Sequence, residues 1–156
     1  MPALTAILYT HNDALRIARA IESLRPCDEV LVIDRGSSDE TCRVALEFGA
    51  RVVIAAKGST DDYVREARHD WVLTLLPTES LSEALEASLY EWRMHDAAQC
   101  SEDAGYAVEI LEETNEGWQA RPAAVRLTHR SYANSREIAS EKSRTLEGPV
   151  LRLRLP

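Results

Sequence analysis

Apolar and polar residues alternate in blocks along the first half of the chain, and each block has the length of one strand or one helix. Four apolar runs predict buried strands at residues 4–9, 30–33, 51–55 and 71–76. After the first run, an apolar stripe at helical spacing predicts a helix that Asn12 or Asp13 caps. Strands that alternate with helices imply parallel pairing through right-handed crossovers.

Two Ser-x-x-Glu sequences have the spacing of a capping box, in which a serine and a glutamate satisfy the free amides of a helix start. Ser37 and Glu40 predict the start of a second helix, which ends near Gly49. Ser80 and Glu83 predict the start of a long helix. The apolar stripe of this helix consists of Leu81, Leu85, Leu89 and Trp92. A polar helical segment is expected around residues 61–68.

The pattern changes in the last third of the chain, where turn residues separate short apolar stretches. Asn115-Glu116-Gly117 predicts a turn between antiparallel strands. The expected elements are a strand at 106–111, returning strands at 118–121 and 124–128, a helix or loop at 131–144, and an edge strand at 150–155. The sequence therefore predicts an α/β, Rossmann-like fold with a mostly parallel sheet flanked by helices and an antiparallel carboxyl-terminal part.

Length and composition fit one globular domain over residues 1–156. The chain is 45% hydrophobic and 28% charged, and it contains no apolar run near the roughly 18 residues of a membrane span. No signal-peptide pattern follows Met1. The three cysteines, Cys27, Cys42 and Cys100, lie far apart without metal-ligand spacing, as in a reducing compartment. We therefore expect a cytoplasmic protein without a membrane span.

The formal net charge of -8 hides an asymmetry along the chain. Residues 1–116 contain 10 Lys or Arg and 23 Asp or Glu, a balance of -13, whereas residues 117–156 contain 8 and 3, a balance of +5. The strongly negative charge of residues 1–116 argues against nucleic acid as a partner. The basic carboxyl segment either covers an acidic face or holds an anion.

The run from Glu29 to Thr41 carries the main candidate site. An apolar strand ends on Asp34, and a turn at Gly36 leads past Asp39 into the next helix. Ligands of open α/β sheets bind at the carboxyl ends of strands, where an aspartate can accept hydrogen bonds from a ribose hydroxyl or a base. In the alternative interpretation, both aspartates only satisfy nearby backbone amides. The chain contains neither the dinucleotide-binding glycine fingerprint nor a P-loop.

Together with Leu4-Thr5-Ala6-Ile7-Leu8-Tyr9-Thr10-His11-Asn12, the stretch from Asp28 to Thr41 resembles the inverting family-two glycosyltransferases, and most of all their bacterial lipopolysaccharide-core branch. The similarity covers roughly the first 90 residues, and Leu146-Glu147-Gly148 echoes it more faintly. The resemblance implies the A-type glycosyltransferase fold and transfer of a sugar from a nucleoside diphosphate to a saccharide or lipid-linked acceptor. It divides the chain into a nucleotide-binding half, 1–99, and a shortened acceptor-side part, 100–156.

The resemblance also implies which residues bind the nucleotide. Thr10 and Asn12 match the nucleotide-side loop, Asp34 matches the residue at the base or ribose, and Asp39 lies near the same pocket. Arg65 stands where related sequences carry a polar run near the donor, so it is expected to meet a phosphate. The alternative for Arg65 is an ordinary surface ion pair.

The chain departs from the family pattern after the fourth strand. Where the family usually reads Asp-Ala-Asp-Glu, this chain reads Leu76-Pro77-Thr78-Glu79, so both aspartates of the metal site are missing. Magnesium or manganese is expected for the family, but leucine and threonine supply no carboxylate to hold it. Glu79 is a weak metal candidate, and its alternative role is to cap the helix that follows. We therefore assign neither metal ligands nor catalytic residues.

Three interpretations remain open at this stage. The chain is an active transferase in which an arginine of the basic carboxyl segment replaces the metal, or a non-catalytic or regulatory relative that still binds nucleotide sugar. In the third interpretation it forms homo-oligomers and binds no nucleotide.

Overall fold

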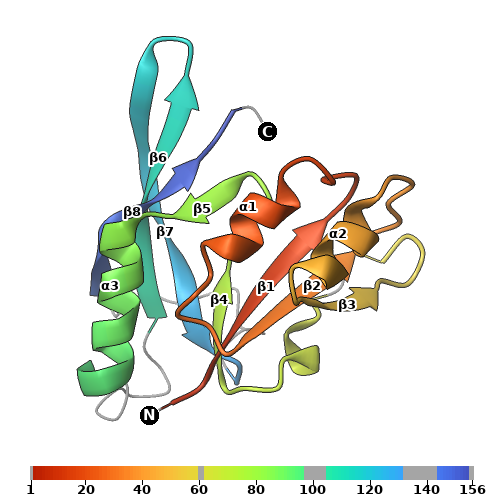
Figure 1. Ribbon diagram of the computed structural model, residues 1–156. Helices are drawn as coiled ribbons and strands as arrows, with labels where there is room; N and C mark the ends of the chain where they lie inside the picture. The colour runs from red at the N-terminus through yellow and green to blue at the C-terminus, as the bar shows by residue number, and fades with distance from the viewer. Residues whose placement is uncertain (1, 60–61, 97–104, 132–143, 155–156) are drawn as a thin grey trace.

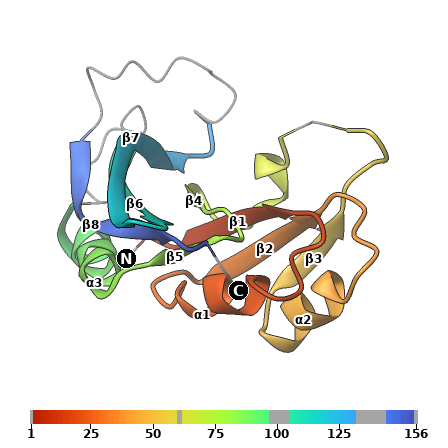
Figure 2. The ribbon, with the colours of Figure 1, turned by 90° about the horizontal axis from the view of Figure 1, so that it is seen from above.

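The computed structural model describes residues 2–59, 62–96, 105–131 and 144–154. These residues form an eight-stranded sheet in the order β3-β2-β1-β4-β7-β6-β8-β5. The sheet curls strongly between its two halves, and helices cover it unevenly (Figures 1 and 2). The observed architecture is the mixed α/β fold that the sequence predicts.

The first half of the sheet consists of four parallel strands, as predicted. These are β1 (Leu4–Thr10), β2 (Glu29–Asp34), β3 (Arg51–Ile54) and β4 (Trp71–Thr74). The helices α1 (Ile17–Glu22) and α2 (Thr41–Glu47) cover one face, and a 3-10 helix (Val64–Glu66) lies on the other (Figure 2). We expected a helical segment around residues 61–68. In the described part of that segment, this 3-10 helix is the only helix observed.

Both faces of the parallel half are apolar, which is why its strands read as continuous apolar runs. Leu4 and Leu8 pack with α1 on one face, in the larger of two buried clusters. Ile7 alternates with them and packs on the other face against Val64 of the 3-10 helix. Alternate residues of β1 therefore pack on opposite faces of the sheet.

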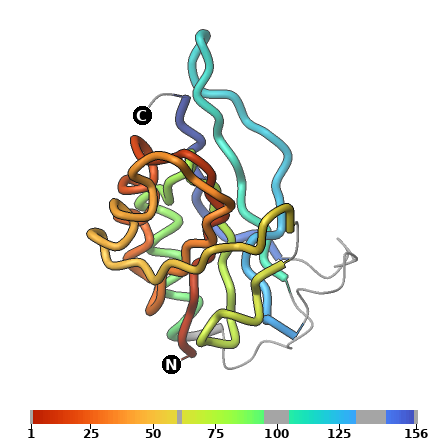
Figure 3. The backbone as a smooth tube through the Cα atoms, turned by 90° about the vertical axis from the view of Figure 1, so that its right-hand side faces the viewer, coloured from red at the N-terminus to blue at the C-terminus, as the bar shows by residue number. Residues whose placement is uncertain are grey.

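The second half of the sheet is mixed. It contains β5 (Glu79–Leu81), β6 (Gly105–Thr114), β7 (Gly117–His129) and β8 (Arg144–Arg152). β7 pairs antiparallel with both β4 and β6, and the β6–β7 hairpin projects far beyond the body of the protein (Figures 1 and 3). The antiparallel return and its turn are confirmed.

The strand expected at 150–155 is present as the end of β8, but the prediction that it lies at the edge of the sheet was wrong. β8 lies inside the sheet, parallel to β6 on one side and antiparallel to β5 on the other. Alternating arginines suggested a solvent-exposed edge, but one of them, Arg152, pairs with a buried carboxylate on β5. Most of the polar segment expected at 131–144 lies outside the described residues.

Both predicted capping boxes were wrong in detail. The residue that immediately precedes α2 is Glu40, and no side chain caps the amides at the start of this helix. The Ser37 hydroxyl, which we expected to do so, donates to Asp34. Helix α3 (Glu83–Glu91) is capped by Ser82, whose Oγ accepts a hydrogen bond from the Leu85 amide at 3.2 Å. Ser80 lies in β5. The pattern predicted both helices, but local spacing did not identify the residue that immediately precedes each of them.

The predicted apolar stripe of the long helix is buried. Leu85, Leu89 and Trp92 are fully enclosed against the mixed half of the sheet, while Leu81 belongs to β5. Trp92, at the end of α3, makes edge-on contacts with Trp71, at a centroid distance of 5.1 Å, and with Tyr106 at 5.8 Å. These aromatic contacts join the two halves into one core. Among the described residues, no helix has the length and apolar character needed to cross a membrane.

Glu29 ties the amino ends of the parallel strands together and gives the fold a pH dependence. Its buried carboxylate accepts hydrogen bonds from the Thr5 hydroxyl at 3.1 Å, the Arg51 Nε at 3.2 Å and the Arg68 amide at 3.1 Å. Burial favours the neutral acid, but these hydrogen bonds outweigh it and hold the pKa of Glu29 below its ordinary value of 4.5.

A group whose pKa is lowered by folding stabilises the folded state above its unfolded pKa, and this stabilisation is lost as the pH falls through the folded pKa. We therefore expect Glu29→Gln to be less stable than the native protein at pH 7, and the difference to shrink below pH 4.5. Urea unfolding of both proteins between pH 7 and pH 3 measures it. A difference that does not change with pH would contradict the assignment.

Candidate nucleotide site and the altered metal corner

The candidate nucleotide site lies where β1 and β2 end side by side. Thr10 and Asp34, the last residues of the two strands, are register partners. The loops that follow, 11–16 and 35–40, are joined by several hydrogen bonds. The Asn12 amide donates to the Ser37 hydroxyl at 2.9 Å, and the Asn12 side-chain oxygen accepts from the Ser38 amide at 2.8 Å. Two loops far apart in sequence thus form one rigid edge.

The backbone at Asn12 adopts the left-handed conformation, with φ of 54°. Asparagine tolerates this conformation better than most residues because its short polar side chain bonds nearby backbone. Thr10 is buried, and its hydroxyl donates to Asp13 at 2.7 Å. Thr10 therefore supports the loop from inside, whereas Asn12 is exposed at the edge.

Asp34 is 2% exposed and accepts hydrogen bonds from the Ser37 amide, at 3.0 Å, and from the Ser37 hydroxyl. These bonds are the local capping that the sequence allowed as the alternative. The Cys42 thiol is a further hydrogen-bond partner of this carboxylate. A carboxylate has about four acceptor positions, so these bonds do not saturate it. Asp34 thus holds the turn and keeps acceptor capacity at the carboxyl edge.

Asp39 joins the same two loops from the exposed side. Its carboxylate accepts from the Ala14 amide at 3.2 Å, from the Thr41 amide at 3.0 Å and from the Thr41 hydroxyl. The hydrogen bond from the Thr41 hydroxyl is the main reason that the pKa of Asp39 lies below its ordinary value. Asp39 is therefore ionised at neutral pH and adds a negative charge to this edge.

Arg65 is not part of this group. It lines a separate cavity of about 470 Å³ together with Asp62, Val64, Asp70, His129, Arg130 and Ser131. Within the described residues, no hydrogen bond or ion pair links Arg65 to the residues at the ends of β1 and β2. The structure thus brings Thr10, Asn12, Asp34 and Asp39 together and places Arg65 elsewhere.

The segment Leu76-Pro77-Thr78-Glu79 leads from the turn after β4 into β5, which begins at Glu79. The Glu79 amide donates to the Leu76 carbonyl at 2.9 Å, and the Leu76 side chain is 40% exposed. β4 runs beside β1, with Thr74 opposite Ile7, so this turn follows toward the same edge of the sheet as Thr10. It occupies the corner where the resemblance places a divalent metal.

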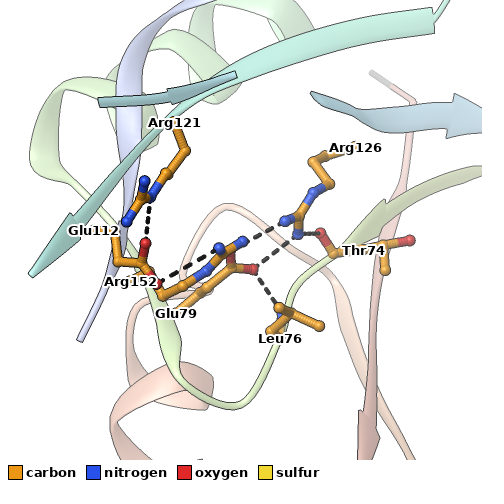
Figure 4. A network of polar contacts seen from close by, with 7 residues as sticks. All are labelled: Thr74, Leu76, Glu79, Glu112, Arg121, Arg126 and Arg152. Atoms are coloured by element: carbon orange, nitrogen blue, oxygen red, sulfur yellow. Dashed lines mark hydrogen bonds and ion pairs between the residues drawn. The ribbon is translucent and has the colours of Figure 1, made fainter. Parts of the chain in front are cut away.

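Glu79 is fully buried and its carboxylate is already occupied (Figure 4). Arg126 binds it through two nitrogens, at 2.8 and 3.0 Å, and Arg152 binds one oxygen at 3.0 Å. The Leu76 amide donates to the other oxygen at 2.9 Å. The expected capping role of Glu79 was wrong, because Glu79 belongs to β5 and Ser82 caps α3.

The residues of this corner do not fit a divalent metal. Leu76 and Thr78 offer no carboxylate, and Glu79, the one carboxylate of the Leu76-Pro77-Thr78-Glu79 segment, faces two guanidinium groups. Magnesium and manganese require several free oxygen ligands. In the part of the chain that the structure describes, no group of three or more His, Cys, Asp and Glu is placed to hold a metal ion. The sequence did not single out Arg126 or Arg152 as site residues. The only signal for them was the charge balance of +5 in residues 117–156.

Comparison with known proteins agrees with this architecture. No protein-family model matches the chain. An uncharacterized glycosyltransferase of Rickettsia felis is 35% identical over 91 residues, which cover 55% of this chain and 32% of that protein. A second, from Rickettsia prowazekii, is 34% identical over 91 residues, covering 55% and 31%. The matches thus span about a third of the length of these relatives.

Two solved structures share the fold. S. aureus TarS superposes with a TM-score of 0.50 and 18% identity, over 72% of this chain and 22% of that one. Glucosyl-3-phosphoglycerate synthase from Mycobacterium tuberculosis, solved with Mn2+, uridine diphosphate and phosphoglyceric acid, superposes with a TM-score of 0.53 and 19% identity, over 74% and 45%.

A parallel half-sheet with a polar carboxyl edge, continued by a mixed half, is therefore a fold that this chain shares with solved glycosyltransferase-like structures. More narrowly, the chain has the A-type glycosyltransferase fold, and over 55% of its length it is similar in sequence to uncharacterized glycosyltransferases.

Proposed function

We propose that this chain binds a nucleoside diphosphate sugar at the carboxyl edge of β1 and β2 and transfers the sugar to a saccharide or lipid-linked acceptor. The observation that carries the proposal is the meeting of Thr10, Asn12, Asp34 and Asp39 at one edge of this fold. Asp34 and Asp39 would accept hydrogen bonds from the base or ribose, and Asn12 would line the loop beside them. Residues 1–99 would form the nucleotide-binding half and 100–156 the acceptor-side part.

In the proposed reaction an acceptor hydroxyl oxygen forms a bond to the anomeric carbon while the bond from that carbon to the diphosphate breaks. The nucleoside diphosphate leaves with the bonding electron pair, and the hydroxyl proton passes to a general base. We also propose that the chain is related to the lipopolysaccharide-core branch of these transferases. We further propose that it acts in the cytoplasm, a reducing compartment that fits its three widely separated cysteines.

The second candidate function is nucleotide-sugar binding without turnover, in a non-catalytic or regulatory relative. Leu76 and Thr78 favour it, because they remove the carboxylates that hold a metal on the departing diphosphate. Both candidates require nucleotide binding, and only the first requires release of the sugar to an acceptor or to water.

Calorimetric titration with uridine diphosphate and guanosine diphosphate tests the proposed binding site. We expect one of them to bind, and Asp34→Asn to weaken that binding about tenfold, because the variant keeps the shape of the carboxylate but loses a charged acceptor. Asp70→Asn is the matched control, since Asp70 is an exposed aspartate paired with Arg130 away from this edge. Absence of heat with both nucleotides would overturn the proposed function.

A further inference from the structure

Two arginines of the basic carboxyl segment converge on the corner that lacks metal ligands. Arg126 comes from β7, next to β4, and Arg152 comes from β8, directly opposite Glu79 of β5. Arg126 also donates to the Thr74 carbonyl at 3.1 Å, at the end of β4. Their side chains are 12% and 28% exposed, so they are held in place yet reach the surface.

The charges in this corner do not balance. Glu79 neutralises one of its two arginines. Glu112 lies 4.0 Å from Arg152 but is hydrogen-bonded to Arg121, which neutralises it (Figure 4). The cluster of Glu79, Glu112, Arg121, Arg126 and Arg152 thus contains three cations and two anions. One positive charge remains in a protein whose formal net charge is -8.

The arginines also have hydrogen-bond donors to spare. A guanidinium carries five N–H groups in a rigid fork. Arg126 uses two nitrogens on Glu79 and Thr74, and Arg152 uses Nε and one terminal nitrogen on Glu79. Guanidinium forks match phosphate oxygens in pairs, so a positively charged cluster with free N–H groups suits a diphosphate.

We propose that Arg126 and Arg152 bind the diphosphate of the donor in place of a divalent metal, so that donor binding at this site is independent of metal. The inference rests on the proposed function, since it supplies the phosphate half of the same site. Glu79 then serves as the anchor that aims both guanidinium groups. In turnover, the same positive charge would stabilise the diphosphate as it leaves.

The first test compares nucleoside mono- and diphosphates in the presence of EDTA and of Mg²⁺. Without metal, we expect uridine diphosphate to bind about tenfold more tightly than uridine monophosphate, because its second phosphate adds charge-assisted hydrogen bonds. The guanosine pair is measured in parallel. Mg²⁺ is expected to leave the diphosphate affinity unchanged or to weaken it, because a cation on the diphosphate competes with the arginines. Tighter binding by tenfold or more with Mg²⁺ would overturn the inference.

The second test changes the charge of the cluster in both directions. Arg152→Gln leaves the Arg126 pair with Glu79 intact and should remove most of the preference for diphosphate over monophosphate. Glu112→Gln removes a partly exposed anion and should strengthen diphosphate binding about threefold, the size of a partly screened charge interaction. A purely structural ion pair predicts no gain from Glu112→Gln. Arg130→Gln is the matched control, being an arginine of the same segment paired with Asp70.

The outcomes separate this inference from the function on which it rests. If no nucleotide binds, the proposed function and the inference both fail. If mono- and diphosphates bind equally without metal, only the inference fails. If Arg65→Gln, rather than Arg152→Gln, removes the diphosphate preference, the phosphates lie in the cavity beside the 3-10 helix and the inference is overturned. Thermal unfolding of each variant verifies that it is folded at the temperature of titration.

Discussion

Replacing Glu79 by alanine is expected to lower the free energy of unfolding by about 3–5 kcal/mol, the cost of breaking a buried ion pair from one side. Glu79 is fully buried and accepts hydrogen bonds from Arg126, Arg152 and the Leu76 amide. Without it, the guanidinium groups of Arg126 and Arg152 lose the anion that they share, and the Leu76 amide loses its partner. Urea unfolding followed by circular dichroism measures the loss.

Glu112→Ala is the matched control for this variant. Its carboxylate is 29% exposed and pairs with Arg121 near the surface, so its removal should cost less than about 1 kcal/mol. Similar losses for the two variants would contradict the central position of Glu79. Glu79→Gln should fall between them, because it keeps one acceptor oxygen but places an amide donor against an arginine.

The Glu79 cluster shows why the sequence alone did not reveal this corner. Arg126 and Arg152 lie 47 and 73 residues from Glu79 along the chain, so no local pattern connects them. The sequence instead suggested a helix cap for Glu79 or, through the family resemblance, a weak metal ligand. The charge balance of the carboxyl segment predicted that an acidic face or an anion lay nearby, but it did not identify which arginines met it.

The parallel half was predictable because its information is local. β1, β2 and β4 are buried on both faces and therefore read as apolar runs, and the first of them is followed by a helical stripe. The end of β2 at Asp34 followed from the same pattern. The pattern did not contain the joining of the loops at Asn12 and Ser37. It also did not contain the position of Arg65 at the cavity beside the 3-10 helix. Both depend on packing between segments distant in sequence.

Gly148→Ala is expected to destabilise the protein by about 3 kcal/mol, because it combines backbone strain with overpacking. Gly148 has φ of +95°, and an added Cβ would lie 2.7 Å from the Ala84 carbonyl carbon and closer still to the Leu85 amide nitrogen. These are backbone atoms in the first turn of α3, so no side-chain rotation relieves the clash. Thermal or urea unfolding measures the effect.

Gly58→Ala is the matched control, because Gly58 also has a positive φ, of +73°, but an added Cβ there meets nothing within 4 Å. It should cost only about 1 kcal/mol, the cost of the backbone conformation. The remainder of the Gly148 effect then reports the close approach of β8 to α3, where the Ser82 amide donates to the Pro149 carbonyl at 3.2 Å. Since Arg152 lies on the same strand, a displaced β8 should also weaken diphosphate binding. Equal losses of stability for the two variants, with diphosphate binding unchanged, would show that β8 does not need this contact to aim Arg152.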